Sequence, residues 1–228
     1  MREVCNTYRA SPARLAEENT HTVCVDEKTG IQALEPISPT LPIRPGTPER
    51  REFEYQRHGT QCLTANFEVA TGRIIAPTVQ PTRDEADFAA HIKRTVATDP
   101  QAGWIFVADN LTTHCSATLV VLVAGRCGIP TESLGKKGTS GVLKSVATRK
   151  AFLADTSHRI RFVYVPKHTS WLNQVEIWFS VLVRRVLRRG TFRSQSELRT
   201  RILEFIDYFN RTLAKPYKWT YAGRPLNV

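Results

Sequence analysis

Three carboxylates have positions from which they could act on a ligand. Asp26 ends the alternating segment VCVD, Asp109 ends the apolar segment WIFVAD, and Glu176 lies within the largely apolar segment WLNQVEIWF. No Lys or Arg lies three or four residues from Glu176, where a helix would place a pairing side chain. Burying an ionised carboxylate without a partner is costly, so we expect Glu176 to face a polar site, a tertiary ion pair or a buried hydrogen-bond network.

Together the three acids would suit a divalent metal site. If the strands that end at Asp26 and Asp109 are neighbours, their ends lie about 5 Å apart, and a helix across them would add Glu176. Converging carboxylates repel unless cations neutralise them, and hard oxygen ligands suit Mg²⁺ or Mn²⁺. Two such ions would activate a water or a 3′-hydroxyl at a phosphodiester. Taken singly, each aspartate is better explained as the start of a turn, and it is the helix with Glu176 that favours a site.

Polar residues near these acids are candidates for a supporting role. On a helix, Asn173, Glu176 and Ser180 form one polar stripe. We expect Asn173, and similarly Asn110 beside Asp109, to orient an acid or a metal-bound water. His114 is expected either near the metals or, equally, in a structural hydrogen bond at a helix start. Glu27 is expected to face away from Asp26, because side chains alternate along a strand.

Regular elements that would position these residues follow from periodicity and capping patterns. The sequence predicts strands over 21–30, 103–110 and 159–166 and a hairpin over 60–79. It predicts helices over about 82–98, 113–127, 171–189 and 194–213. The first and the last of these helices begin with the capping boxes Thr82–Glu85 and Ser194–Glu197. This order indicates a mixed α/β sheet with helices on its faces. The proline-rich stretch 36–50 is expected to be an ordered loop or a flexible flap.

Positive charge is concentrated in the second half of the chain. The net charge is +11, with −2 over residues 1–130, +5 over 131–165 and +8 over 166–228. Such clustering favours a polyanionic partner, nucleic acid above all, over a merely solvated basic surface. A two-carboxylate glycoside hydrolase would leave this asymmetry unexplained. The candidate phosphate contacts are Lys136, Lys137 and Lys144 in a mobile loop, Lys167, and the cluster Arg184, Arg185, Arg188 and Arg189.

Composition limits the cellular setting. The 228 residues, 41% of them hydrophobic, can form one sizeable domain, and no apolar run is long enough to span a membrane or to serve as a secretory signal. The five cysteines are odd in number and form no CxxC pair, which predicts a reducing, cytoplasmic location.

Six segments in order give the sequence a family resemblance. CVDEKTGIQALE, RREFEYQRHGT, FVADNLTTH, PKHTSWLNQVEIWF, LRRGTFRS and FIDYFNRTLAKPYKWTY closely resemble the catalytic domain of DDE transposases, in particular the bacterial insertion-sequence branch of the mariner-like superfamily. The resemblance runs from about residue 20 to the C-terminus. It implies that Asp26, Asp109 and Glu176 are the catalytic, metal-binding acids.

The resemblance also implies a fold and a reaction. The fold would be RNase H-like, a mixed five-stranded sheet flanked by helices, with the first acid on its central strand. The reaction would be Mg²⁺-dependent cleavage of double-stranded DNA at transposon ends, with Mn²⁺ as a substitute and two ions per site, followed by strand transfer into a short target such as TA. A homodimer on DNA, associated with the bacterial nucleoid, is implied as well.

Two departures from the family pattern affect these expectations. The second and third acids are unusually far apart, and we attribute the excess to a basic insertion at about 131–158, before the last strand. Residues 1–20 form a lead-in too short for the helix-turn-helix modules that usually precede the catalytic domain, which would occupy 21–228. We therefore keep two functional hypotheses: a transposase catalytic domain, or a truncated DNA-binding remnant that no longer transposes.

Overall fold

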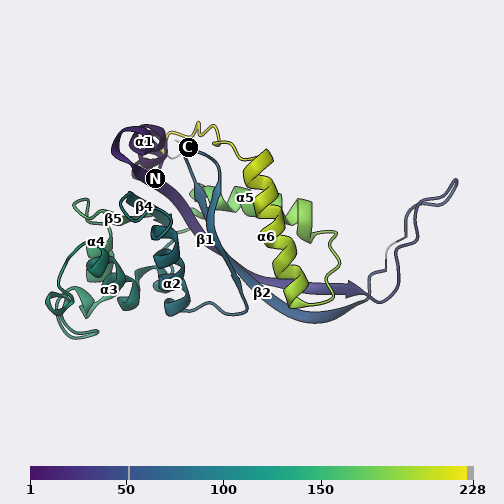
Figure 1. Ribbon diagram of the computed structural model, residues 1–228, viewed down its shortest axis with the longest axis horizontal. Helices are drawn as coiled ribbons and strands as arrows, with labels where there is room; N and C mark the ends of the chain where they lie inside the picture. The colour runs from purple at the N-terminus through teal and green to yellow at the C-terminus, as the bar shows by residue number, and fades with distance from the viewer. Residues whose placement is uncertain (51, 225–228) are drawn as a thin grey trace.

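A five-stranded mixed sheet forms the centre of the structure. This computed structural model describes residues 1–50 and 52–224. The strands are β1 (Thr20–Pro36), β2 (Tyr55–Glu68), β3 (Ile74–Gln80), β4 (Gly103–Ala108) and β5 (Ile160–Tyr164), in the spatial order β3-β2-β1-β4-β5 (Figure 1). β1 is central, antiparallel to β2 and parallel to β4, and β4 is parallel to β5. The predicted strands, hairpin and mixed sheet are confirmed.

The central strand is longer than the sequence predicts. Lys28-Thr29-Gly30 resembles a turn, but β1 continues past it to Pro36, and the register with β2 shifts between Lys28 and Ile31. Gly30 has φ +65°, a backbone conformation that side chains with a Cβ rarely adopt. The glycine therefore serves a β-bulge within one strand, and bulges bend and twist a strand without ending it.

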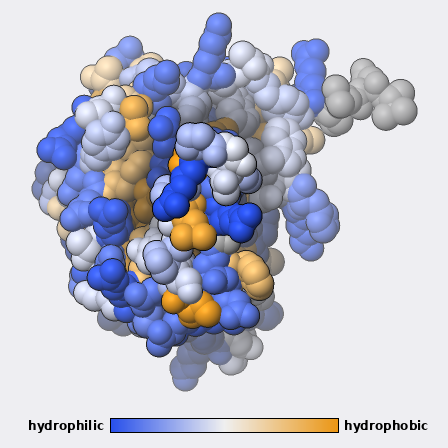
Figure 2. Space-filling view, turned by 90° about the vertical axis from the view of Figure 1, so that its right-hand side faces the viewer, coloured by the Kyte–Doolittle hydropathy of each residue, from blue (hydrophilic) through white to orange (hydrophobic). Residues whose placement is uncertain are grey.

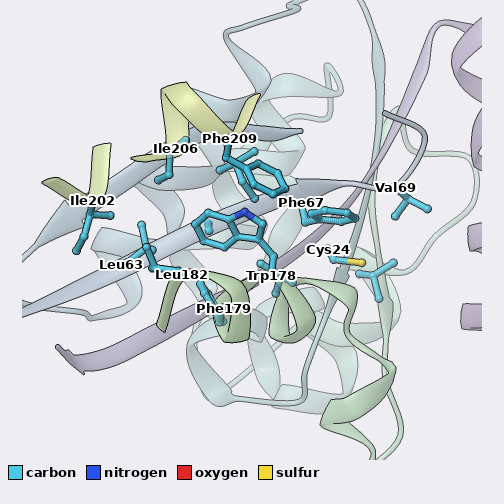
Figure 3. Close-up of a cluster of buried hydrophobic side chains, with 14 of the residues drawn as sticks. Cys24, Leu63, Phe67, Val69, Trp178, Phe179, Leu182, Ile202, Ile206 and Phe209 are labelled. Atoms are coloured by element: carbon cyan, nitrogen blue, oxygen red, sulfur yellow. The ribbon is translucent and has the colours of Figure 1, made fainter. Parts of the chain in front are cut away.

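Helices cover both faces of the sheet and define two cores. α1 (Arg2–Glu18), α5 (Gln174–Leu182) and α6 (Gln195–Thr212) share one core with Cys24 of β1, whereas α2 (Glu85–Val96), α3 (Ala117–Arg126) and α4 (Val146–Leu153) share the other with Val25. Alternation along β1 thus sends neighbouring side chains into opposite cores. Figure 3 shows Trp178 of α5 in the first core, close to Phe67 of β2 and Phe209 of α6.

Residues 1–20 are part of this packing. The sequence suggests only a lead-in there, but α1 buries Val4, Cys5 and Tyr8 against the first core. The Tyr8 hydroxyl donates to the Leu172 carbonyl oxygen at 2.7 Å, which ties α1 to the turn that precedes α5. The helix was missed because Pro12 lies inside it and proline is a strong sign of a helix end.

Helix starts differ from the predicted ones by a few residues. Asp84, not Thr82, caps α2: its carboxylate accepts from two backbone N–H groups and Asp87 completes the capping box. Ser194 caps α6 as predicted, but the Glu197 carboxylate accepts from the backbone N–H of Arg193 instead of returning to the cap. α5 begins at Gln174, after a short 3₁₀ turn, and passes into a π-helical turn over Val183–Leu187.

The stretch expected to be a mobile basic loop is folded. Residues 131–158 form two 3₁₀ turns, Thr131–Leu134 and Val142–Lys144, and then α4. Leu134 and Leu153 are fully buried, and the Arg149 guanidinium donates to the Cys115 carbonyl oxygen at 2.7 Å. The prediction of a mobile loop is therefore wrong, because two leucines and one arginine attach the segment to α3 and its lead-in turn.

A long arm connects β1 to β2. The described part of 37–54 extends away from the sheet (Figure 1) and contains only two isolated antiparallel bridges, Leu41 with Arg50 and Arg44 with Thr47. Figure 2 views the molecule from the side of this arm and shows hydrophobic atoms among hydrophilic ones on that face; Ile43 and Phe53 are strongly exposed. In the described part of the chain, no helix combines the length and apolar character that crossing a membrane requires.

Candidate active site

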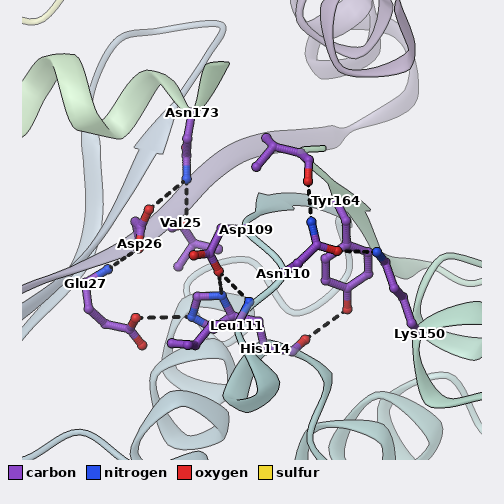
Figure 4. Close-up of polar contacts among 11 residues, drawn as sticks. Val25, Asp26, Glu27, Asp109, Asn110, Leu111, His114, Lys150, Tyr164 and Asn173 are labelled. Carbon is purple, nitrogen blue, oxygen red and sulfur yellow. Dashed lines mark hydrogen bonds and ion pairs between the residues drawn. The ribbon is translucent and has the colours of Figure 1, made fainter. Parts of the chain in front are cut away.

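The two aspartates lie side by side on neighbouring strands of the sheet. Cys24 of β1 pairs with Val107 of the parallel strand β4, and Asp26 and Asp109 each follow two residues later. Parallel strands keep this register, so both carboxylates lie at the same level, where β4 ends (Figure 4). The expectation that the two strands are neighbours is thereby confirmed. Asp26 itself lies inside β1, which continues to Pro36, so the prediction that it ends a strand is wrong.

Asp26 is buried, and burial disfavours its negative charge. Its Oδ1 accepts from the Glu27 backbone N–H at 2.8 Å, and its Oδ2 accepts from the Asn173 side-chain amide at 3.3 Å. Burial, partly offset by the Glu27 bond and reinforced by the charges of Asp109 and Glu176, raises the pKa of Asp26 to about 7. The three acids are thus close enough for their charges to interact, and a cation beside Asp26 would relieve the repulsion.

Asp109 is held by a buried histidine. His114 lies in the 3₁₀ turn Thr112–Cys115, and its Nδ1 is 2.6 Å from Asp109 Oδ1, which also accepts from the Leu111 backbone N–H at 2.8 Å. Burial alone would raise the pKa of Asp109, but the His114 and Leu111 hydrogen bonds outweigh it and leave that pKa below its usual range. Asp109 is therefore ionised, and no hydrogen bond within the described residues reaches its Oδ2.

His114 is connected to a fourth carboxylate, one that the sequence does not place in the site. The His114 Nε2 is 3.2 Å from Glu27 Oε2, and the Glu27 side chain is buried. Burial opposes a charged imidazole, but the bonds to Asp109 and Glu27 raise the pKa of His114 to about 9. Glu27 does face away from Asp26, as alternation predicts, yet it reaches Asp109 through the histidine. No sequence pattern marks that link.

Glu176 does not lie in the apolar environment that its neighbours in the sequence suggest. α5 packs through Val175, Trp178, Phe179 and Leu182, and Glu176 is on the exposed side of the helix. It lines a cavity with Lys28 of β1, Ser180 and Arg184. Of the predicted polar stripe, Glu176 and Ser180 face solvent on the same side as Lys28, whereas Asn173 is buried, so no buried network is needed to accommodate the charge of Glu176.

The two asparagines have different surroundings. Asn173 is fully buried, and its amide also donates to the Val25 carbonyl oxygen at 3.0 Å, so it fixes both the backbone and the carboxylate at Asp26. Asn110 instead donates to the Val165 carbonyl oxygen and accepts from the Lys150 ammonium. It joins the ends of β4 and β5 to α4, and its side chain hydrogen-bonds to none of the three acids.

The candidate phosphate contacts are distributed over several surfaces. All eight residues lie at least partly exposed: Lys136, Lys137, Lys144, Lys167, Arg184, Arg185, Arg188 and Arg189. Lys137 forms an ion pair with Glu85 at 3.3 Å. The arginines do not form one cluster, because Arg184 faces the cavity of Glu176 whereas Arg185 and Arg189 line another cavity with Arg201 and Tyr208 of α6.

The donor set fits a hard divalent cation, although it is not preassembled. Within residues 1–50 and 52–224, no three Asp, Glu, His or Cys side chains are clustered as a ready metal site. The observations that favour a cation are the displaced pKa of Asp26 and the unpartnered Oδ2 of Asp109, together with a third carboxylate near them. Carboxylate oxygens are the ligands that Mg²⁺ and Mn²⁺ prefer. The arrangement therefore suits a metal-dependent reaction at this place on the sheet.

The family follows from a comparison of the sequence. Residues 21–199 match the family described as DDE superfamily endonuclease, and the chain belongs to that family. The predicted family is thereby confirmed. No match was found among the curated proteins.

Solved structures with a similar fold are complexes and domains of the Mos1 mariner transposase. The Mos1 mariner paired end complex with Mn has 14% identity and a TM-score of 0.52, over 91% of this chain and 54% of that chain. The catalytic domain of Mos1 mariner transposase has 11% identity and a TM-score of 0.45, over 92% and 80%. The first likeness shows the fold, and the predicted RNase H-like class is confirmed. This chain spans about half the length of the Mos1 chain in that complex.

Proposed function

We propose that this chain is a transposase catalytic domain that cuts double-stranded DNA and transfers the cut strand to a target. The observation that carries the proposal is the placement of Asp26 and Asp109 at the same level of two neighbouring strands, with the Glu176 charge close enough to affect Asp26. Family membership supports the same chemistry. Retention of all three acids argues against the alternative of a non-cutting remnant.

In this proposal the three acids hold two Mg²⁺ ions, or Mn²⁺ in their place. When bound, such ions supply an activated water or 3′-hydroxyl and neutralise the leaving oxygen. Asp109 offers its free Oδ2, and Asn173 keeps the Asp26 carboxylate in place. Exposed Glu176 can turn toward the aspartates at little cost because no packing restrains it. Asn110 and His114 support the site from behind Asp109.

DNA would lie across the basic surfaces on both sides of the acids. Arg184 is close to Glu176, so it would contact a phosphate next to the cut, whereas Arg185, Arg188, Arg189, Lys167 and the lysines of 131–158 would contact phosphates further away. Phosphate contacts position DNA without reading its sequence. We further propose transposon ends as the substrate, a short target such as TA, and a homodimer on DNA; the Mos1 mariner paired end complex with Mn has this fold.

The test is Mn²⁺-dependent nicking of supercoiled plasmid by the purified chain and by Asp26→Asn, Asp109→Asn and Glu176→Gln. Each substitution is isosteric and removes one charged ligand, so each should lower nicking at least about 100-fold, the upper range for losing a metal-supporting group. Glu132→Gln, on an exposed turn, is the matched control and should cut normally. Ca²⁺ should permit DNA binding with little cutting because its coordination is looser.

Two outcomes would contradict the proposal. If the acid variants cut as fast as the unaltered chain, the three acids are not the ligands. If the unaltered chain binds DNA but does not cut with either Mn²⁺ or Mg²⁺, the remnant hypothesis replaces the transposase hypothesis.

A further inference from the structure

One buried ion pair is connected to the candidate acids without belonging to them. The Glu27 side chain is 4% exposed and His114 is fully buried. The imidazole lies between two carboxylates, with Nε2 3.2 Å from Glu27 Oε2 and Nδ1 2.6 Å from Asp109 Oδ1 (Figure 4). Glu27 comes from β1 and His114 from the turn after β4, so the pair also joins the two strands that carry Asp26 and Asp109.

The geometry determines what the histidine does. An ionised carboxylate only accepts hydrogen bonds, so a ring nitrogen beside one must donate, and His114 has a carboxylate at each nitrogen. The ring of Phe88 lies against the imidazole, with centroids 4.2 Å apart. Turning His114 about its side-chain bonds would break both hydrogen bonds and this packing at once. The ring is therefore fixed in one orientation.

A fixed ring in turn fixes the carboxylate of Asp109. Both hydrogen bonds to that carboxylate, from His114 and from the Leu111 backbone, end on Oδ1. The other oxygen, Oδ2, stays available to a metal ion. Without His114 the carboxylate could rotate and place either oxygen in either position, and a metal ion would first have to order it.

We propose that Glu27 is a positioning residue of the metal site: it holds His114, and His114 holds Asp109 so that Oδ2 is free for the cation. This inference rests on the proposed role of Asp109 as a metal ligand. Glu27 touches neither DNA nor metal in this scheme. Its contribution is transmitted through one hydrogen-bonded histidine, in the way that outer partners of metal ligands set ligand orientation.

The experiment measures Mn²⁺ affinity without DNA and without turnover, from the free Mn²⁺ signal in electron paramagnetic resonance. Glu27→Leu removes the partner of Nε2 and should weaken Mn²⁺ binding about 10- to 100-fold, the range for outer-sphere partners. Glu27→Gln should lose less than about 10-fold, because a Gln amide can donate to Nε2 while Nδ1–H still donates to Asp109. If Glu27→Gln keeps most of the Mn²⁺ affinity that Glu27→Leu loses, the side chain acts by positioning His114 and not through its negative charge.

The double variant Glu27→Leu with His114→Phe addresses folding. Replacing both partners of a buried polar pair by apolar groups is far less costly than replacing one. If Glu27 acts only through His114, the double variant should lose no more affinity than His114→Phe alone. An additional loss of about 10-fold or more would mean that Glu27 acts by another route, and the proposal would fall.

A matched control lies near the start of β1. Glu68, the last residue of β2, is buried and pairs with His21 Nδ1 of β1 at 2.5 Å, and no hydrogen bond between described residues links this pair to Asp26, Asp109 or His114. Glu68→Leu should lower thermal stability as Glu27→Leu does, but leave Mn²⁺ affinity unchanged. Equal losses of affinity in the two variants would show a merely structural effect and overturn the proposal.

The same titration separates this inference from the proposed function. If the unaltered chain binds no Mn²⁺, or binds it equally well after Asp109→Asn, the metal site itself is wrong. The other case is that the unaltered chain does bind Mn²⁺ through Asp109. If Glu27→Leu, or the double variant where Glu27→Leu does not fold, then binds Mn²⁺ within about threefold of the unaltered chain, only the role of Glu27 is wrong.

Discussion

Replacing His91 by glutamine should make the stability of the protein less dependent on pH between 7 and 5. His91 of α2 is fully buried, and its ring nitrogens lie 2.7 Å from the Asn66 amide and 2.8 Å from the Thr78 hydroxyl. No carboxylate faces either nitrogen among the described residues. Burial, with a smaller effect from the positive charge of Arg94, lowers the pKa of His91 to about 3.

The direction of the effect follows from proton linkage. In the unfolded chain the pKa of His91 returns to 6.5, so below that pH the unfolded state binds a proton that the folded state refuses until about pH 3. Stability from this residue is complete above pH 6.5 and is lost as the pH falls toward 3. At 1.36 kcal/mol per pKa unit, the free energy of unfolding should fall by about 2 kcal/mol between pH 7 and pH 5 on account of His91 alone.

Urea unfolding of the unaltered chain and of His91→Gln at pH 7 and pH 5 isolates this contribution. Other titrating groups are common to both proteins and cancel in the comparison. The glutamine variant should be less stable at pH 7, since it loses fitted contacts, yet its loss between the two pH values should be smaller by about 2 kcal/mol. Parallel losses in the two proteins would refute the reasoning and mean that His91 is protonated in the folded state.

Three further predictions concern the site and the core. Asp26→Asn should stabilise the protein in EDTA, because it removes a buried carboxyl whose pKa is raised to about 7; at about 1.36 kcal/mol per pKa unit the gain is at most about 4 kcal/mol. The same substitution should abolish the stabilisation by Mn²⁺ in thermal melts. Arg184→Gln should reduce both DNA affinity and nicking, whereas Arg185→Gln with Arg189→Gln should reduce affinity alone. For each phosphate-binding cation removed, the slope of log affinity against log salt concentration should become shallower by about 0.9. Trp178→Ala should cost about 3–5 kcal/mol in urea unfolding, but Trp178→Phe much less, because the buried indole N–H has no partner to lose.

Much of the fold could be predicted because it depends on local patterns. The strands that carry Asp26 and Asp109 alternate or are apolar throughout, and such patterns are direct signs of half-buried and fully buried strands. Failures occurred where a residue has two possible meanings. Gly30 serves a bulge as well as it would serve a turn, and Pro12 lies inside a helix that tertiary packing holds in place.

The site was harder to predict than the fold. The strand patterns indicate that the two aspartates are neighbours, although Asp26 lies inside its strand and not at the end. The apolar neighbours of Glu176 in the sequence have side chains on other sides of α5, so they do not describe its surroundings. The Glu27–His114 contact joins residues that are distant in sequence, and the short turn that places His114 has no recognisable pattern. The division of the arginines follows from helical periodicity, because Arg185 and Arg189 are four residues apart and share a face, whereas Arg184 points to another side.

Parallel pairing of β1 with β4 has a consequence for folding kinetics. The hairpin of β2 and β3 joins residues close in sequence, but β1 meets β4 by pairing Thr20 with Gly103, after a long loop has closed. Such non-local contacts form slowly, because the entropy of closing the loop is lost before the contacts compensate for it. Asp26 and Asp109 therefore come together late, after the local elements exist. Under the proposed function, a chain still on the folding pathway would be basic enough to attract DNA before it has the acid pair needed to cut it.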